Sequence, residues 1–370
     1  MRIHYFPLER YQERYTEMLD TWVLNVLTQK HDVRRYGHAV MQRIECGRVL
    51  DGTKRVSYCA EQVQQFMDAL RQGQVRDMDV LWFDDMFTPG IEGIFYALHM
   101  HGIRPRIWTR CWAQTPDVYD FTFHMQSWMR HYEHMVCEKV EHVFVACQEH
   151  KDLCVVAGWP AHKIVVTGLP FSTDDVHDRY LEAWPRVELQ DELNAERSPS
   201  LIYSSRWDRE KNPSLFLDLA EDIDRRHTVR GAVPVRVCTG HESLTGTDHR
   251  AIARAYEMAE SGALQIHTNL SKGDYYAYLM MSTTQVNTAL QDWVSFTMLE
   301  AMSFNVASVV PAFRGFLSCT DPIQRYLPGC RSSLYDAVER SWDKREDWLS
   351  AQLSVLATHN TTLDRQEHML

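Results

Sequence analysis

The stretch from residue 285 to residue 311, QVNTALQDWVSFTMLEAMSFNVASVVP, constrains the fold more than any other part of the chain. Val286 to Leu290 predicts a short buried strand, because the run is apolar or β-tolerant and stops at two polar residues. A helix should begin after Ser295, a good N-cap, and end at Asn305, which tolerates the left-handed conformation. Val306 to Val310 is β-branched and predicts another strand. This order of elements is typical of parallel α/β sheets.

The turn before this helix carries the chemistry. A helix N-terminus offers unpaired backbone N–H groups and about half a positive charge, which suits a phosphate. The backbone of residues 295–297 is therefore a candidate phosphate site, with Asp292 before it and Glu300 further along the helix. Two carboxylates would repel a bare phosphate, so we expect them to accept hydrogen bonds from hydroxyl groups attached to it. A sugar on one side and a ribose on the other would meet this requirement.

A second motif lies upstream, after the apolar run Leu201 to Ser205. The sequence RWDREKNP follows, with Arg206 and Lys211 five residues apart, and then a helical pattern from Leu215. Two cations on a loop after a strand can neutralise a pyrophosphate leaving group. Either motif alone is more often structural, as solvated surface charges or as a helix cap with an ion pair. Their order, each after an apolar strand, favours one shared site.

Together these residues resemble family-four retaining glycosyltransferases, whose signature is a Glu, seven residues and a second Glu. Asp292 and Glu300 have that spacing, although Asp292 replaces the first Glu, Ser295 a Gly, and Asn305 the Gly that ends the helix. The resemblance implies the GT-B fold. That fold has two Rossmann-like α/β domains facing across a cleft, with a C-terminal helix that returns to the first domain.

The resemblance also implies roles for single residues. Arg206 and Lys211 would hold the donor diphosphate, Glu300 the ribose hydroxyls and Asp292 the sugar hydroxyls. The donor would be a nucleotide-sugar substrate, expected to be UDP-linked, and a GT-B enzyme needs neither a cofactor nor a metal. The further donor-binding candidates at strand exits and at the helix start are Ser205, Gly240, Asn269, Leu270, Ser295, Phe296 and Thr297.

Candidate acceptor residues follow the strands predicted at Val80 to Phe83 and Arg106 to Thr109, because parallel sheets bind ligands at their carboxyl ends. These candidates are Asp84, Asp85, Trp112, Asp117 and His124. Residues 30–55 hold seven Lys or Arg side chains against three Asp or Glu, a net charge of +4. Such a segment is either a solvated face or a track for an anionic acceptor, such as double-stranded DNA or an acidic glycan.

At 370 residues the chain is too long for one ordinary core, and strands alternate with helices twice over. We predict an acceptor-binding domain at 1–171, a connection at 172–198, a nucleotide-sugar domain at 199–335, and a C-terminal helix and tail at 336–370. Within the tail, Asp336 to Leu356 predicts one amphipathic helix. No pattern bears on oligomeric state.

Localisation follows from what the sequence lacks. No run approaches the roughly 18 apolar residues that span a bilayer, and the N-terminus has no apolar signal region. Nine cysteines without a CxxC pair favour free thiols in a reducing compartment. We therefore expect a cytoplasmic protein, in the host cytoplasm if a bacteriophage encodes it.

Three functions remain open. The first is a metal-independent hexosyl- or pentosyltransferase that modifies a hydroxymethylated base in phage DNA, because QDWVSFTMLEA resembles divergent phage members of this fold; Trp108 and Trp112 would then stack on the extruded base. The second is a transferase acting on a surface glycan or small molecule, which fits the net charge of −11 better. The third, of another class, is a nucleotide-sugar-binding protein without turnover.

Overall fold

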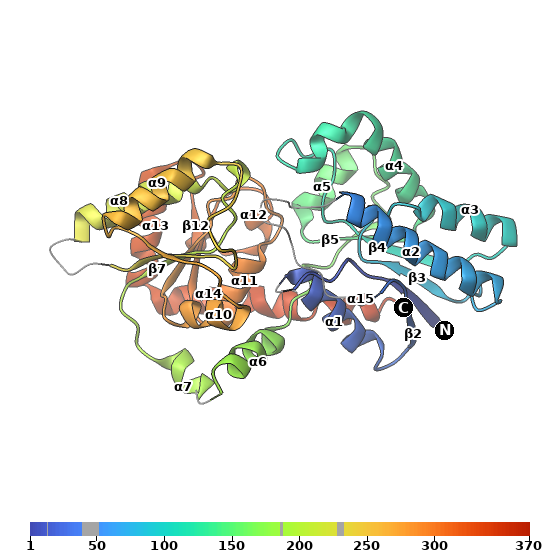
Figure 1. Cartoon of the computed structure of the whole chain (residues 1–370), viewed down its shortest axis with the longest axis horizontal. Helices are drawn as coiled ribbons and strands as arrows, with labels where there is room; N and C mark the ends of the chain where they lie inside the picture. The colour runs from blue at the N-terminus through green and yellow to red at the C-terminus, as the bar shows by residue number, and fades with distance from the viewer. Residues whose placement is uncertain (13, 39–51, 186–187, 228–232) are drawn as a thin grey trace. The chain divides into compact units, whose positions relative to one another are not determined.

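The computed structural model describes residues 1–12, 14–38, 52–185, 188–227 and 233–370, and the chain divides into two compact units. The first unit comprises Met1–Pro170 and Thr362–Leu370, and the second comprises Phe171–Thr361. Each unit has one six-stranded sheet flanked by helices (Figure 1), and all the strand pairings described are parallel.

The first unit has the strand order β2-β1-β3-β4-β5-β6. Its strands are β1 (Arg2–Phe6), β2 (Asp32–Arg35), β3 (Val80–Phe83), β4 (Arg106–Arg110), β5 (His142–Val145) and β6 (Ile164–Val166). Its helices are α1 (Tyr15–Leu27), α2 (Gly52–Arg71), α3 (Ile91–His101), the 3₁₀ turn η1 (Phe121–Met125), α4 (Gln126–Lys139), α5 (Gln148–Val156) and α15 (Thr362–Glu367). The central strand β3 is buried throughout, as its apolar sequence VLWF predicts.

The second unit has the strand order β12-β11-β10-β7-β8-β9. Its strands are β7 (Leu201–Tyr203), β8 (Val235–Cys238), β9 (Gln265–His267), β10 (Thr284–Val286), β11 (Ala307–Pro311) and β12 (Arg325–Tyr326). Its helices are α6 (Thr173–Ala183), α7 (Leu189–Asn194), η2 (Arg209–Lys211), α8 (Pro213–His227), α9 (His249–Glu260), α10 (Lys272–Met280), α11 (Phe296–Ser303), α12 (Phe316–Cys319), η3 (Pro322–Gln324), α13 (Arg331–Asp343) and α14 (Arg345–Asn360).

The stretch 285–311 folds as strand, turn, helix and strand, as predicted. Asn305 takes the left-handed conformation, with a φ of 55°, directly after Phe304, the C-cap of α11. The first strand is shorter than expected, because β10 ends at Val286 and residues 287–290 continue as loop. The N–H of Leu290 instead donates to the carbonyl of Glu210 at 2.7 Å. The chain therefore leaves the sheet early in order to contact the loop after β7.

Two other predictions were wrong in detail. Edge strand β2 was missed because three of its four residues, DVRR, are charged, and an edge strand tolerates charges that a central strand does not. The helix predicted from Asp336 to Leu356 is two helices, since Lys344 has φ −121° and ψ 40° and breaks the helix between α13 and α14. A break of this kind, without proline or glycine, leaves no local mark in sequence.

Two expectations concern the whole chain. All eight cysteines in the described ranges are free thiols, whereas Cys46 lies outside those ranges. None of the helices in the described part of the chain combines the length and the apolar character that crossing a bilayer requires.

The C-terminal helix α15 belongs to the first unit and contacts α1 (Figure 1), which confirms the predicted return of the chain end. The carboxylate of Glu367 pairs with the Lys30 ammonium at 2.7 Å and with His31 Nε2 at 2.9 Å. The buried amide of Gln366 donates to Thr167 Oγ1 at 2.7 Å and accepts from Arg110 Nη2 at 2.7 Å. These contacts tie α15 to the ends of β4 and β6.

Replacing Gln366 with Ala should lower the free energy of unfolding by about 2–3 kcal/mol, because it leaves buried donor and acceptor groups of Arg110 and Thr167 without this partner. Urea denaturation measures this change. The matched control is Gln64→Ala on the exposed face of α2, where the side chain contacts Asp68 in solvent and the expected change is within about 0.5 kcal/mol. Equal effects of the two substitutions would contradict this account of α15.

Candidate functional site

The candidate site of the second unit lies at the carboxyl ends of its strands. Strands β7 and β10 are hydrogen-bonded neighbours in the middle of the sheet, so the loops that follow them start side by side. Ligands of parallel α/β sheets bind at this edge. The predicted cation motif follows β7 and the predicted carboxylate motif follows β10.

The cation loop and the carboxylate turn are in contact. The ammonium of Lys211 donates to the carbonyl of Gln291 at 2.9 Å and lies 3.6 Å from Asp292 Oδ2. The Arg206 guanidinium binds Asp208 at 2.5 Å through Nη1 and Glu210 at 2.6 Å through Nη2. These two ion pairs fix the direction of the guanidinium before any ligand arrives.

A third loop holds the cation loop in place. Asp208 Oδ1 accepts from the N–H of Thr247 at 2.9 Å, and the N–H of Asp248 donates to the Trp207 carbonyl at 2.9 Å. Gly246 lies so close that a Cβ there would be 2.2 Å from the Trp207 backbone. A residue larger than glycine at position 246 would therefore displace the loop that carries Arg206 and Lys211.

Helix α11 begins at the same edge. Ser295 has the extended backbone of an N-cap, but its side chain does not cap the helix, and its Oγ lies 3.0 Å from Thr297 Oγ1. The serine thus leaves the N–H groups of the first turn without a side-chain cap. Phe296 is half-buried beside these groups.

Glu300 is 2% exposed and has two different oxygens. Oε1 accepts from the Lys272 ammonium and, at 3.1 Å, from the hydroxyl of Tyr276, and both of these residues lie on α10. Oε2 is buried and has no hydrogen-bond partner among the described residues. A buried carboxylate oxygen without a donor is costly, so this atom favours a ligand hydroxyl. Sequence reasoning missed Lys272, although a lysine at the start of a helix that follows a strand was a usable signal.

The loops after β8 and β9 bind each other through their backbones. Asn269 has a φ of 55°, and its N–H donates to the His241 carbonyl at 2.8 Å. The N–H of Leu270 donates to Thr239 at 3.2 Å, and a Cβ at Gly240 would lie 3.2 Å from the Leu270 carbonyl oxygen. These predicted donor-binding residues therefore form one paired loop at the sheet edge.

Helix α10, which follows the loop after β9, contacts the loop after β7. The hydroxyl of Tyr275, near the start of α10, lies 2.9 Å from Ser204 Oγ, and the half-buried Ser205 precedes Arg206. The structure thus brings all the predicted donor-side residues to one edge of one sheet.

Gly315 supports the carboxylate turn by a close approach. A Cβ at this position would lie 1.6 Å from the carbonyl oxygen of Trp293, the residue after Asp292. No side-chain rotation relieves such an overlap, because the backbone fixes the position of the Cβ and its neighbour is a backbone carbonyl. The absence of a side chain at Gly315 therefore allows the turn that contains Asp292 to lie against residue 315.

Gly315→Ala should destabilise the protein by about 1–3 kcal/mol, because the turn at Trp293 has to move. Gly93→Ala is the matched control, since this glycine lies in α3 with nothing within 4 Å of an added Cβ. There we expect a gain of up to about 1 kcal/mol from helix propensity. Urea denaturation of both variants tests the prediction, and a neutral result for Gly315→Ala would refute it.

Lys272→Met should destabilise the protein by about 2–4 kcal/mol, because the buried Glu300 carboxylate loses its counter-charge. Lys272→Arg keeps the positive charge and should recover at least half of the lost unfolding free energy. Chemical denaturation of the two variants measures this difference. If both substitutions cost the same, the charge of Lys272 is not what stabilises Glu300.

The candidate acceptor residues lie in the first unit, at the ends of β3 and β4. Asp84 is fully buried, where its carboxylate accepts from Tyr5, Arg110 and, at 3.1 Å, Trp82. Burial raises the pKa of Asp84 above its usual range, and the Arg110 guanidinium opposes this shift. Asp84 therefore holds Tyr5, Arg110 and Trp82 together below the surface and does not contact solvent.

The other acceptor candidates differ in accessibility. Asp85 pairs with Arg55 at 3.1 Å, and burial raises its pKa to about 6. Trp112 Nε1 donates to the Asp84 carbonyl at 2.5 Å, which brings these three residues together. Asp117 is buried further along the loop, where its Oδ1 accepts from the N–H of Tyr119 at 3.1 Å, and His124 is exposed on η1.

The proposed DNA contacts meet two difficulties. Trp108 is fully buried in β4 and offers no ring face to an extruded base, so that part of the prediction was wrong. Several cations of the 30–55 segment already pair with carboxylates, namely Lys30 with Glu367, Arg35 with Asp20, and Arg55 with Glu9 and Asp85. Arg43 and Arg48 lie outside the described residues.

Comparisons with known proteins identify the fold. No protein-family model matches the chain, and no curated protein matches it by sequence. Sucrose-phosphate synthase from Thermosynechococcus elongatus superposes with a TM-score of 0.69 at 10% identity, covering 100% of this chain and 98% of that one. Anabaena HepE in complex with UDP gives 0.65 at 9%, covering 100% of both chains. The lipopolysaccharide outer core galactosyltransferase WaaB gives 0.62 at 14%, covering 99% of this chain and 100% of that one.

These likenesses extend over essentially the whole chain, and together with the two parallel sheets they confirm the predicted GT-B fold. At identities of 8–14% they establish fold alone.

Proposed function

We propose that this protein is a retaining glycosyltransferase that moves a sugar from a UDP-linked donor to a hydroxyl group. The observation that carries the proposal is the contact of Lys211 with Gln291 and Asp292, which joins the cation loop to the turn before α11. An anion placed there would face two cations and the N–H groups of a helix start. HepE, which has the same fold, was solved with UDP bound.

In this proposal the donor diphosphate lies between Arg206, Lys211 and residues 295–297. Arg206 is held by Asp208 and Glu210 in a loop that is itself fixed by residues 246–248, so little ordering is needed on binding. Preorganised cations stabilise the charge that develops on the leaving diphosphate more than they stabilise the bound donor. These groups therefore act mainly on the rate of sugar transfer.

Glu300 and Asp292 would bind hydroxyl groups on either side of the diphosphate. Glu300 Oε2 is buried with no donor in the described part of the chain, which suits a ribose hydroxyl, while Oε1 stays with Lys272 and Tyr276. Asp292 lies within 4 Å of the Lys211 ammonium and is more exposed than Glu300. It would accept a hydrogen bond from the transferred sugar.

The chemistry needs few groups from the protein. The bond between the anomeric carbon and the diphosphate oxygen breaks, and the acceptor oxygen bonds to the same face of that carbon. The acceptor proton goes to an oxygen of the departing diphosphate, so electrons and protons balance without a base from the chain. Arg206 and Lys211 offset the negative charge that appears on the leaving group.

For the acceptor we propose a glycan or a small hydroxylated molecule. The chain segment from the loop after β4 into α4 exposes the aromatic residues Tyr119, Phe121 and Trp128 by 44%, 49% and 56%. Aromatic rings of this kind stack on sugar faces, whereas Trp108 is buried. The named activities of WaaB and sucrose-phosphate synthase concern carbohydrate products. This acceptor class also fits the net charge of −11.

Arg206→Ala and Lys211→Ala should each reduce donor turnover about 100-fold, because each removes a cation from the leaving group. The assay is release of UDP from UDP-glucose and UDP-galactose, with and without a carbohydrate acceptor mixture. The control is Arg225→Ala, an exposed arginine on α8 that pairs with Glu221 on its own helix. UDP should raise Tm in the wild type and the control more than in the two site variants.

Two outcomes would count against the proposal. Turnover that is unchanged in both site variants would remove the assigned roles of Arg206 and Lys211. UDP binding that depends on both residues, without any release of UDP from either donor, would instead favour a nucleotide-sugar-binding protein.

A further inference from the structure

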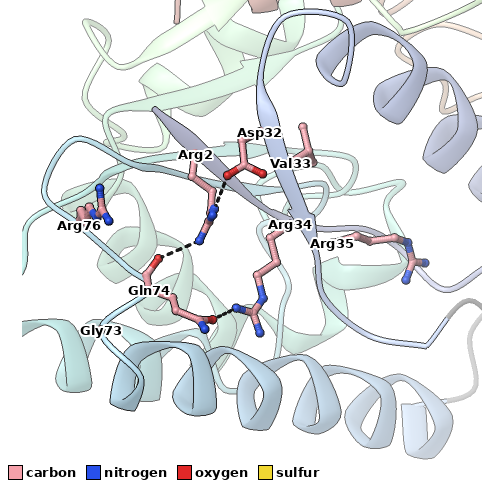
Figure 2. A pocket seen from close by; sticks show the side chains of 8 residues that line it. All are labelled: Arg2, Asp32, Val33, Arg34, Arg35, Gly73, Gln74 and Arg76. Carbon is pink, nitrogen blue, oxygen red and sulfur yellow. Dashed lines mark hydrogen bonds and ion pairs between the residues drawn. The ribbon is translucent and has the colours of Figure 1, made fainter.

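The first unit contains an arginine-rich pocket beside the edge strand of its sheet. The pocket has a volume of about 690 Å³ and lies beside the edge strand β2, the start of β1 and the turn after α2 (Figure 2). Its lining residues are Arg2, Asp32, Val33, Arg34, Arg35, Gly73, Gln74 and Arg76. The candidate acceptor residues, in contrast, follow the carboxyl ends of β3 and β4.

The lining carries four guanidinium groups and one carboxylate, a net charge of +3. This charge is unusual in a protein whose net charge is −11. Apart from Val33, the lining offers almost no apolar side chain. A ligand that matches these walls is anionic and otherwise hydrophilic.

Arg35 does not contribute to binding. Its guanidinium makes three hydrogen bonds to Asp20, two through Nε and one through Nη2, at 3.0–3.2 Å, and it donates to the Gly37 carbonyl at 2.6 Å. Figure 2 shows this side chain pointing away from Arg2, Gln74 and Arg34. Its charge is balanced within the fold.

Hydrogen bonds hold Arg2 and Arg34 in place but do not occupy all of their N–H donors. Arg2 Nε donates to Asp32 at 2.7 Å and Nη1 to the Gln74 carbonyl at 3.5 Å, while Arg34 Nη1 donates to Gln74 Oε1 (Figure 2). In the described part of the chain this is the one hydrogen bond of the Arg34 side chain, which leaves four N–H donors. The exposed guanidinium of Arg76 has no partner among the described residues.

We propose that this pocket is a second ligand site, which binds the phosphoryl group of a small phosphorylated compound such as a sugar phosphate. One guanidinium group can bind two phosphate oxygens at once through two parallel N–H donors. Arg34 and Arg76 both have the N–H donors for such contacts. Ligand pockets range from about 300 to 1,000 Å³, so the volume admits a phosphate together with a sugar-sized body. The site is separate from the proposed donor site, which lies in the other unit.

His4 of β1 is the register partner of Arg34 in β2 and can report on the occupancy of the pocket. It is fully buried, with Nδ1 2.6 Å from the Tyr36 hydroxyl and Nε2 3.3 Å from Asp79 Oδ2. Burial lowers the pKa of His4, Asp79 raises it, and the positive charges of Arg2 and Arg34 lower it further. An anion bound to these arginines cancels part of their field, so the pKa of His4 should rise on binding.

The first experiment is calorimetric titration of the full chain with glucose 6-phosphate and with inorganic phosphate, at saturating UDP so that the donor site is filled. Arg34→Gln combined with Arg76→Gln should weaken binding of both anions at least 10-fold. The control combines Arg130→Gln with Arg225→Gln, which removes the same charge from exposed positions outside the pocket. UDP affinity should be the same in all three proteins.

The possible outcomes separate the alternatives. Equal anion binding by the two double variants would place the ligand elsewhere and overturn the proposal. Binding of a short DNA duplex through Arg34 and Arg76, without binding of either small anion, would overturn it in favour of a nucleic-acid surface. Loss of UDP binding in every protein would count against the proposed transferase but leave this site untouched.

The second experiment follows the His4 ring by NMR across pH, with the signal assigned through its loss in His4→Gln. Saturating glucose 6-phosphate should move the midpoint of the His4 titration to higher pH in the wild type. The shift should be absent in the Arg34→Gln, Arg76→Gln double variant. Binding that leaves the His4 midpoint unchanged would show that the anion does not bind beside Arg34, and would overturn the proposal.

Discussion

The parallel pairing of β7 with β10 is the constraint on which the candidate site depends. Thr284 pairs with Leu201 and Gln285 with Ile202, so two segments more than 80 residues apart leave the sheet at the same edge. Because β10 ends early, Leu290 bonds to Glu210 and Lys211 reaches Gln291 and Asp292. Without this register, the cations and carboxylates would be separate surface charges.

Each of the three site cations at this edge already has a carboxylate near it. Arg206 lies between Asp208 and Glu210, Lys211 faces Asp292, and Lys272 faces Glu300. Such ion pairs keep the side chains ordered before a ligand binds, and the attraction between the charges offsets part of the free-energy cost of removing them from water. A bound diphosphate would replace some of these carboxylates as the partner of the cations. A hydroxyl group attached to the diphosphate would donate to Glu300 Oε2, which has no hydrogen-bond partner among the described residues.

The first unit uses its charges differently. Around β3 and β4 they are buried and paired, as in the Asp84–Arg110 pair and the contacts of Gln366 with Arg110 and Thr167. Beside the edge strand β2, Arg34 is half-buried and Arg76 is exposed, and both keep N–H donors that have no partner among the described residues. The same residue type therefore stabilises the sheet at one end and forms a candidate anion site at its edge.

The amino-acid sequence by itself determined the alternation of strands and helices, the end of α11 at the left-handed Asn305, and the two motifs. These features depend on hydrophobic periodicity and helix capping, which involve residues close together in the sequence. The tertiary structure decided what depends on residues far apart. Charged β2 became an edge strand, Trp108 proved buried, Lys272 paired with Glu300, and Gly315 set the position of the Asp292 turn. Burial and partner choice are properties of packing, which no local stretch of sequence specifies.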